Sequence, residues 1–468
     1  MRRFALALIF AGLLVTRFCH LNIVWVEEGY PTAAAIQILK GKALYRDVVF
    51  DKPPLSPFFY LLWGARTGWP LRLAGAGFVF LCCWLMFRFA SHLWSGREGL
   101  LASFFLAFYL TFGIPAAVMA LAPDLLMIAP HIGAVWLAWR RRAFWAGLVA
   151  GFAMLINTKA IFVVAACLLW CWPAWPWLLI GFVLPNAAAQ AWFGRPYIDE
   201  VWKWGAVYSA HGFSVATGLV RTADWMGFQA ALVVGVVLYF WSERSWRMLA
   251  WVVLSLVGVA AGWRFFPRYY FQLLVPMALL AARGFVLYQR TWWRWMLPVL
   301  LLIPLVRFGP RYVILADDLM HHRAHQWSDL ALGQDSEAAA NPIQDRSGTL
   351  LVWGYRPDIF AWTRMEAGTP FLDSQPLTGV LADRHLTNAT VFYPELAAAN
   401  RRELVKTNPT YIVDGLGPLN PALAIGNYPD LKAWLHGYRE IGRTPFSVVY
   451  VSKSTARSSR PDVSPGKQ

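Results

Sequence analysis

Two groups of ionisable residues stand close together near the N-terminus of an otherwise apolar chain. The stretch "WVEEGYPTAAAIQILKGKALYRDVVFDKPPLSP" carries the adjacent carboxylates Glu27 and Glu28, and further along it carries Asp51 and Lys52. A carboxylate in a cleft can act as a general base, and a lysine can stabilise a departing phosphate. Because only 15% of the chain is charged, this concentration predicts a polar site at the surface of an apolar molecule.

Other polar residues occur where later apolar runs end, and each run end is an expected membrane boundary. These residues are Asp124, Lys159, Arg264, Arg268 and Tyr269. Helical bundles bring such loop ends together, so we expect one convergent site on the outer face. A base beside phosphate-binding cations suits transfer of a group from a phosphate carrier to a hydroxyl or an amine. At a lipid boundary, we expect that carrier to be a lipid phosphate.

The composition predicts which elements position this site. Of the 468 residues 58% are apolar, with 27 Trp and 31 Phe, which is typical of a multi-pass helical membrane protein. The apolar runs predict about eleven transmembrane helices, the first from about Phe4 to Val26. The formal charge of +16 resides in short arginine-rich turns, which favours an N-terminus inside, a C-terminus outside and no binding of nucleic acid.

The hydropathy pattern divides the chain into three regions. Residues 1–308 are expected to form the membrane domain, with amphipathic helices in a first outer loop at 27–70. Residues 309–455 are expected to form a small soluble α/β domain outside the membrane, because β-rich runs alternate with helical stretches. The runs "TLLVWGY", "ATVFYP", "TYIVDG" and "SVVYVSK" predict strands of a largely parallel sheet. Residues 456–468 are expected to be disordered.

The stretch "EEGYPTAAAIQILKGKALYRDVVFDKPPLSPFFYLL" resembles the first outer loop of the GT-C superfamily of glycosyltransferases. The similar branches are the protein O-mannosyltransferase-like and the lipid A aminoarabinose transferase-like enzymes. The segments "APDLLM", "GLVAGFAMLINTKAIFVV" and "GWRFFPRYYFQLLVPMALLAARG" agree with the family's order. The resemblance covers about residues 20–285, and a soluble outer C-terminal domain is common in the superfamily.

The resemblance implies an inverting membrane glycosyltransferase of the bacterial inner-membrane type, with a polyprenyl-phosphate sugar as donor. Glu27 matches the family's catalytic base, and Lys52 matches the lysine that contacts the donor phosphate. Asp124 matches an acid near the acceptor or the metal, and Asp51, with Glu28, is implied in holding a divalent ion where one is used. The other implied contacts of the donor phosphate are Lys159, Arg264, Arg268 and Tyr269. The acceptor is a lipid, a glycan or a protein.

Three positions depart from the family's pattern. The first acid is Glu27 where relatives usually carry Asp. In the turn "FPRY", Arg268 stands where relatives carry a histidine. Tyr30 stands where the aminoarabinose branch carries an arginine, so the chain is less similar to that branch.

Each candidate also has a purely structural interpretation. Glu28 can cap a helix, Asp124 can be an N-cap, and Asp51 with Lys52 can be a surface ion pair. Lys159, and Arg17 on the first helix, can extend to the membrane interface. A transporter or flippase of lipid-linked glycans is the alternative function, although transporters carry charges at mid-membrane and often show internal repeats, neither of which is visible here.

Overall fold

The computed structural model describes residues 2–289 and 292–454, and within them the chain forms two compact units. The membrane unit comprises the described residues up to 22, 51–59 and 67–325. The C-terminal unit comprises 23–50, 60–66 and the described residues from 326 onward. Most of the predicted first outer loop therefore belongs to the same unit as the C-terminal residues, while its segments 51–59 and 67–70 belong to the membrane unit.

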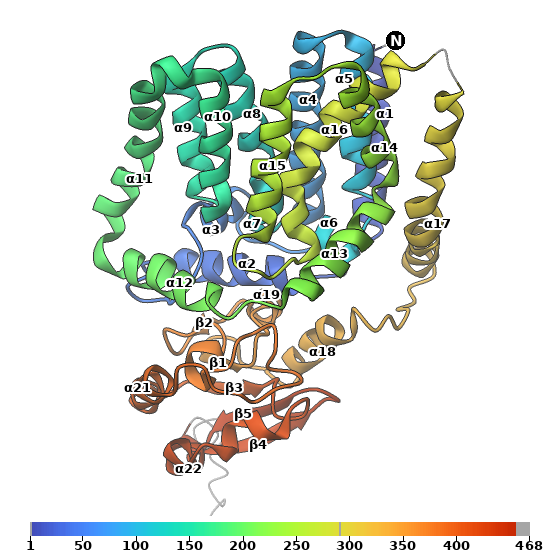
Figure 1. The fold of residues 1–468 in the computed structure, drawn as a ribbon. Helices are drawn as coiled ribbons and strands as arrows, with labels where there is room; N and C mark the ends of the chain where they lie inside the picture. Colours follow the sequence, from blue (N-terminus) through green and yellow to red (C-terminus); the bar gives the residue numbers. More distant parts are fainter. Residues whose placement is uncertain (1, 290–291, 455–468) are drawn as a thin grey trace, which may run out of the picture. The chain divides into compact units, whose positions relative to one another are not determined.

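The membrane unit is helical, and Figure 1 shows its helices in order along the chain. The first helices are α1 (Arg2–Phe18), α3 (Leu55–Tyr60, whose last residue lies in the other unit), α4 (Trp69–Leu93), α5 (Gly96–Tyr109), α6 (Pro115–Val118), α7 (Pro123–Leu126), α8 (Ile128–Trp139) and α9 (Ala143–Met154). The later helices are α10 (Ile161–Cys171), α11 (Trp175–Tyr197), α12 (Trp204–Ser209), α13 (Val215–Phe228), α14 (Ala230–Ser242), α15 (Trp246–Ala260), α16 (Phe271–Leu287) and α17 (Trp293–Met320).

Glycines allow the helices of this unit to approach closely. Helix α14 packs against α16, and a Cβ added at Gly284 would collide with the carbonyl oxygen of Gly235. Helix α9 packs against α11 in the same way, because a Cβ at Gly147 would collide with the carbonyl oxygen of Leu178. Small residues at such contacts are typical of helix packing in membranes.

The structure corrects several predicted spans. Among the described residues, four helices are long and apolar enough to cross a membrane, or five if the bent pair α13–α14 is one span, so the predicted count of about eleven is not confirmed. The first helix ends at Phe18 instead of Val26, and the predicted span 100–121 is broken between α5 and α6. Pro115 and Pro123 each begin a new helix, since proline fits the first turn but interrupts a helix interior. Residues 194–224, which are more polar than the flanking apolar runs, are largely helical.

The C-terminal unit contains a five-stranded sheet in the order β2-β1-β3-β5-β4. Its strands are β1 (Thr349–Trp353), β2 (Glu366–Ala367), β3 (Tyr411–Asp414), β4 (Tyr438–Arg443) and β5 (Val448–Ser452). Strand β1 pairs in parallel with β2 and β3, whereas β5 pairs antiparallel with β3 and β4. The helices are α2 (Val26–Leu39), α18 (Ala331–Ala340), α19 (Asp358–Thr363), α20 (Gln375–Thr378), α21 (Pro394–Val405) and α22 (Pro429–Leu435).

This unit confirms three predicted strands and differs from the prediction at several points. The runs "TLLVWGY", "TYIVDG" and "SVVYVSK" contain β1, β3 and β5, but "ATVFYP" forms no strand, and the sheet is mixed instead of largely parallel. Strand β4 is not among the predicted strands. Helix α17 continues through the predicted domain boundary at 308–309. The predicted disordered tail lies outside the described residues.

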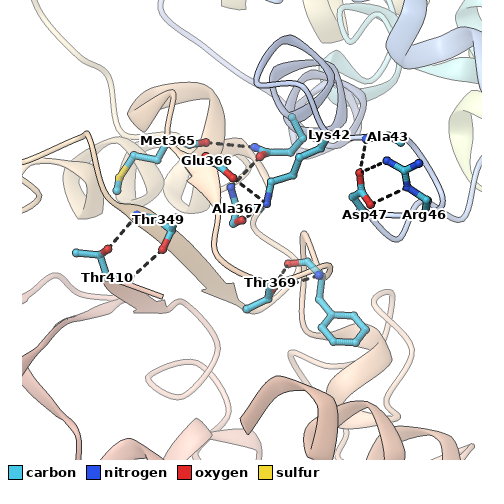
Figure 2. Close-up of polar contacts among 12 residues, drawn as sticks. Lys42, Ala43, Arg46, Asp47, Thr349, Met365, Glu366, Ala367, Thr369 and Thr410 are labelled. Carbon is cyan, nitrogen blue, oxygen red and sulfur yellow. Dashed lines mark hydrogen bonds and ion pairs between the residues drawn. The ribbon is translucent and has the colours of Figure 1, made fainter. Parts of the chain in front are cut away.

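Helix α2 is fastened to the edge strand β2, although more than 300 residues separate them in the sequence (Figure 2). The buried amide of Gln37 donates from Nε2 to the carbonyl oxygen of Met365 (3.2 Å) and accepts at Oε1 from the amide of Ala367 (2.7 Å). Lys42 donates to the carbonyl oxygen of Ala367 and pairs with Glu366 (3.2 Å). The helix that begins at Val26 is thus an integral part of the C-terminal unit.

Replacing Gln37 by leucine is expected to loosen this attachment by about 2–4 kcal/mol, because two buried backbone groups lose their partners. Hydrogen exchange of the α2 and β2 amides should accelerate by at least about tenfold, since each 1.4 kcal/mol changes an equilibrium tenfold. Lys406→Ala, which removes an exposed ion pair with Glu403, is the control and should leave exchange unchanged. Unaltered exchange in Gln37→Leu would show that other contacts hold α2.

Candidate functional site

The membrane unit places Lys52 between a carboxylate and an aromatic ring. Its Nζ atom donates to Asp51 Oδ2 at 2.9 Å and lies 5.9 Å from the centre of the Tyr208 ring. Pro53 and Pro54 follow directly and restrict the backbone before α3. Burial disfavours the ammonium charge, but the pairing with Asp51 outweighs it and raises the pKa of Lys52. Lys52 is therefore positively charged at neutral pH.

Asp124 is held from two sides by a cation and an amide. It lies in the first turn of α7, where its Oδ1 accepts from Asn157 Nδ2 (2.9 Å) and its Oδ2 is 3.4 Å from Arg268 Nε. Asn157 is also an N-cap, because its Oδ1 accepts from the amide of Lys159 (3.0 Å). The same asparagine thus fixes Asp124 and the turn that carries Lys159.

Lys159 presents a buried ammonium group that has no hydrogen-bond acceptor among the described residues. Its Nζ lies over the ring of Tyr269, and the charges of Asp124, Arg268 and Lys52 act on it. Gln272 of α16 donates to the Lys159 carbonyl oxygen (3.4 Å) and ties the two segments together. A buried ammonium needs a compensating partner, so this atom is available to an anionic ligand.

Arg264 is buried beneath Tyr208 and sits in an unusual stretch of backbone. Its guanidinium lies 4.1 Å from the Tyr208 ring centre and donates to the Tyr208 carbonyl oxygen at 3.0 Å. Both neighbours, Trp263 (φ 52°) and Phe265 (φ 49°), adopt left-handed backbone angles. Bulky residues rarely adopt this conformation, and such strain tends to occur at functional sites.

The membrane unit therefore brings together seven of the nine predicted site residues, namely Asp51, Lys52, Asp124, Lys159, Arg264, Arg268 and Tyr269. Three contributors were missed: Asn157, Tyr208 and Glu200, whose carboxylate lies within electrostatic reach of Asp51. Basic side chains outnumber acidic ones in this cluster, because Lys52, Lys159, Arg264 and Arg268 stand among Asp51, Asp124 and Glu200. Such a cluster can hold a phosphate and stabilise the charge that grows on it as it departs.

Glu27 and Glu28 belong to the C-terminal unit, in the first turn of α2. Glu28 is fully buried, and its Oε1 accepts from the amide of Trp25 (3.1 Å), which supports the capping interpretation. The carboxylate of Glu27 lies within electrostatic reach of Asp358. Burial, together with the Glu27 charge, raises the pKa of Asp358. That Glu27 lies close to Lys52 stays a prediction.

The residues do not gather into a recognisable metal site. In the part of the chain that the structure describes, no group of three or more His, Cys, Asp or Glu side chains is arranged to hold an ion. Both oxygens of Asp124 are engaged by Asn157 and Arg268, and an oxygen of Asp51 accepts from Lys52. A metal at Asp51 and Glu28 stays a prediction of the family resemblance.

No protein-family model matches the chain, and no curated protein matches it. Among solved structures, it is similar to ArnT from Cupriavidus metallidurans bound to undecaprenyl phosphate, with a TM-score of 0.60, 15% identity and coverage of 95% of this chain and 97% of that one. It is also similar to the apo oligosaccharyltransferase of Archaeoglobus fulgidus, with a TM-score of 0.51, 12% identity and coverage of 94% and 73%. The same oligosaccharyltransferase with an inhibitory peptide and a dolichol-phosphate gives a TM-score of 0.51, 13% identity and coverage of 99% and 75%. The chain thus shares the overall fold of these structures, as the family resemblance predicted, whereas the predicted number of spans is not confirmed.

Proposed function

We propose that the protein is a membrane glycosyltransferase that moves a sugar from a polyprenyl-phosphate-linked donor to an acceptor hydroxyl, with inversion at the anomeric carbon. One observation carries the proposal: the buried Lys159 ammonium, which has no hydrogen-bond acceptor in the described chain, lies in a cationic cluster on the GT-C fold. Solved relatives of this fold hold undecaprenyl phosphate and a dolichol-phosphate, which supports a lipid phosphate as the ligand.

The charge of the cluster suits this donor. A polyprenyl-phosphate sugar is a phosphodiester with one negative charge, and the polyprenyl phosphate that leaves is a monoester with up to two. Lys159, Lys52 and Arg268 would therefore bind the departing phosphate more strongly than the intact donor. An interaction that strengthens as charge develops lowers the barrier to the reaction.

Glu27 is proposed as the base. It takes the proton of the acceptor hydroxyl as that oxygen bonds to the anomeric carbon, while the bond from this carbon to the phosphate oxygen breaks on the opposite face. Support comes from the chain path: Tyr30, in the same helix, stacks on Phe50 (4.8 Å between ring centres), and Phe50 directly precedes Asp51. The ring contact thus ties the first turns of α2 to Phe50, the residue that precedes Asp51 and Lys52 in the chain.

Asp124 is proposed to position Arg268 and to lie near the acceptor, as the family resemblance implies. The arginine-rich turns favour an orientation in which the site faces away from the cytoplasm. A divalent ion at Asp51 and Glu28 stays an expectation of the family resemblance. Every step proposed here uses side chains of the chain itself.

The proposal is tested in cells by mass spectrometry of envelope glycans, lipids and glycoproteins with and without the gene. Loss of one sugar from one class of acceptor, restored by the wild-type protein and not by Lys159→Gln, is the expected result. An unchanged set of glycoconjugates in cells shown to express the protein would contradict the proposal.

A further inference from the structure

Two arginines are buried side by side in the membrane unit, apart from the cluster around Lys159. Arg17 in the last turn of α1 is 0% exposed, and Arg72 in the first turns of α4 is 1% exposed. The sequence predicted that Arg17 reaches the membrane interface, and its complete burial corrects this prediction. Buried charges in membrane helices are costly and are therefore associated with function.

The partners of these arginines are backbone carbonyl groups. Arg17 donates from Nη2 to the carbonyl oxygen of Val118 (3.0 Å), while Arg72 donates from Nε to that of His20 (3.1 Å) and from Nη1 to that of Met119 (3.4 Å). The Nε and Nη1 atoms of Arg17 are buried and have no hydrogen-bond partner within residues 2–289 and 292–454. Arg17 thus retains two unused donors in a place that water does not reach.

The groups whose charges act on Arg17 are cationic or neutral. The charges and titratable groups that act on Arg17 are those of Tyr312, Arg72, Cys83 and Cys82, and no carboxylate is among them. Arg311, next to Tyr312 on α17, acts on His20 together with Arg17 and Arg72. The rings of His20 and Tyr312 are 5.4 Å apart at their centres. Arg17 forms no ion pair with any residue that the structure describes.

We propose that Arg17 and Arg72, with Arg311 beside them, form a phosphate-binding site that is distinct from the Lys159 cluster. A guanidinium offers paired donors that match the oxygens of a phosphate, and it is the side chain preferred where a phosphate is bound in a desolvated place. The bound group is the phosphate of an anionic lipid or a free phosphate ion. Both arginines lie near helix ends, where lipid phosphates are found, and the proposal does not depend on the transfer activity.

The test is the ligand-induced stabilisation of the purified full chain in detergent. Three probes are titrated: short-chain phosphatidate, the matching diacylglycerol without phosphate, and inorganic phosphate. A ligand that binds the folded state raises the unfolding temperature with its concentration. We expect phosphatidate or inorganic phosphate to stabilise the wild type and diacylglycerol to have no effect. Whichever of the two phosphate probes binds more tightly identifies the source of the group.

Variants show where the phosphate binds. The unfolding temperature of each variant with ligand is compared with that of the same variant without ligand. Arg17→Gln should weaken the phosphate affinity by about tenfold or more. Arg88→Gln, at an exposed arginine of α4, the helix that carries Arg72, should leave it unchanged. Lys159→Gln tests whether the effect arises at the other cationic cluster instead. If Arg17→Gln does not fold, Arg72→Gln is measured in its place and should weaken the phosphate affinity in the same way. The inference is overturned if neither phosphate probe stabilises the wild type more than diacylglycerol does, or if only Lys159→Gln abolishes the effect.

Discussion

The Lys159→Gln variant is expected to lower the turnover number of sugar transfer by about 10²–10³-fold while leaving the protein as stable as the wild type or more stable. The activity falls because the departing phosphate loses a cation that has no other hydrogen-bonded task in the described chain. The stability does not fall because glutamine removes a buried charge that has no hydrogen-bond acceptor in the described chain, and such a charge is costly in the free protein. Turnover and the midpoint of thermal unfolding are measured on the same preparation.

A fall in turnover without a fall in stability distinguishes a ligand-binding role of Lys159 from a structural one. A lysine needed only for packing would lower stability and activity together when replaced. Lys203→Gln is the matched control, since Lys203 is exposed and pairs with Asp199 on the same face of its helical segment. It should change neither quantity. Full activity in Lys159→Gln would remove the phosphate contact on which the proposed function depends.

The Glu27→Gln variant is expected to lose about 10²–10⁴-fold in turnover, because an amide cannot take the proton from the acceptor hydroxyl. Glutamine keeps the size and polarity of the side chain, so the fold of α2 and the affinity for the donor should be retained.

The neighbouring Glu28→Gln variant is the control for Glu27. The glutamine Oε1 can still accept from the Trp25 amide, so the start of α2 stays capped. We expect activity within a few-fold of the wild type. Equal losses in the two variants would assign both acids a structural task, and a normal rate in Glu27→Gln would place the base elsewhere, with Glu200 beside Asp51 as the next candidate.

Charged residue types revealed most of the membrane-unit site before any coordinates. Lys52, Lys159 and Arg268 were predictable because a charge is rare in an apolar chain and therefore conspicuous. Asn157 and Tyr208 are neutral and common beside membranes, so only the hydrogen bond to Asp124 and the ring contacts reveal them. Arg17 was visible in the sequence but its environment was not, because sequence alone cannot separate a buried arginine from one that reaches the membrane interface.

The division of the chain was beyond sequence reasoning for a different reason. Hydropathy indicates which residues avoid water, but the attachment of α2 to β2 depends on Gln37 meeting Met365 and Ala367 across a very long sequence separation. The predicted eleven spans also assumed that an apolar run is one straight helix. Pro115 and Pro123, which begin α6 and α7 within 100–139, show that it is not.

The most direct test is the fate of the donor lipid in proteoliposomes that contain the purified protein, a panel of polyprenyl-phosphate sugars and hydroxyl acceptors. The lipid phosphates are extracted and identified by mass spectrometry. We predict that at least one donor is converted to free polyprenyl phosphate with its sugar on an acceptor, and that Lys159→Gln with Glu27→Gln abolishes this conversion. Donors that all remain intact, or that only move between the two leaflets, would contradict the account and favour a flippase.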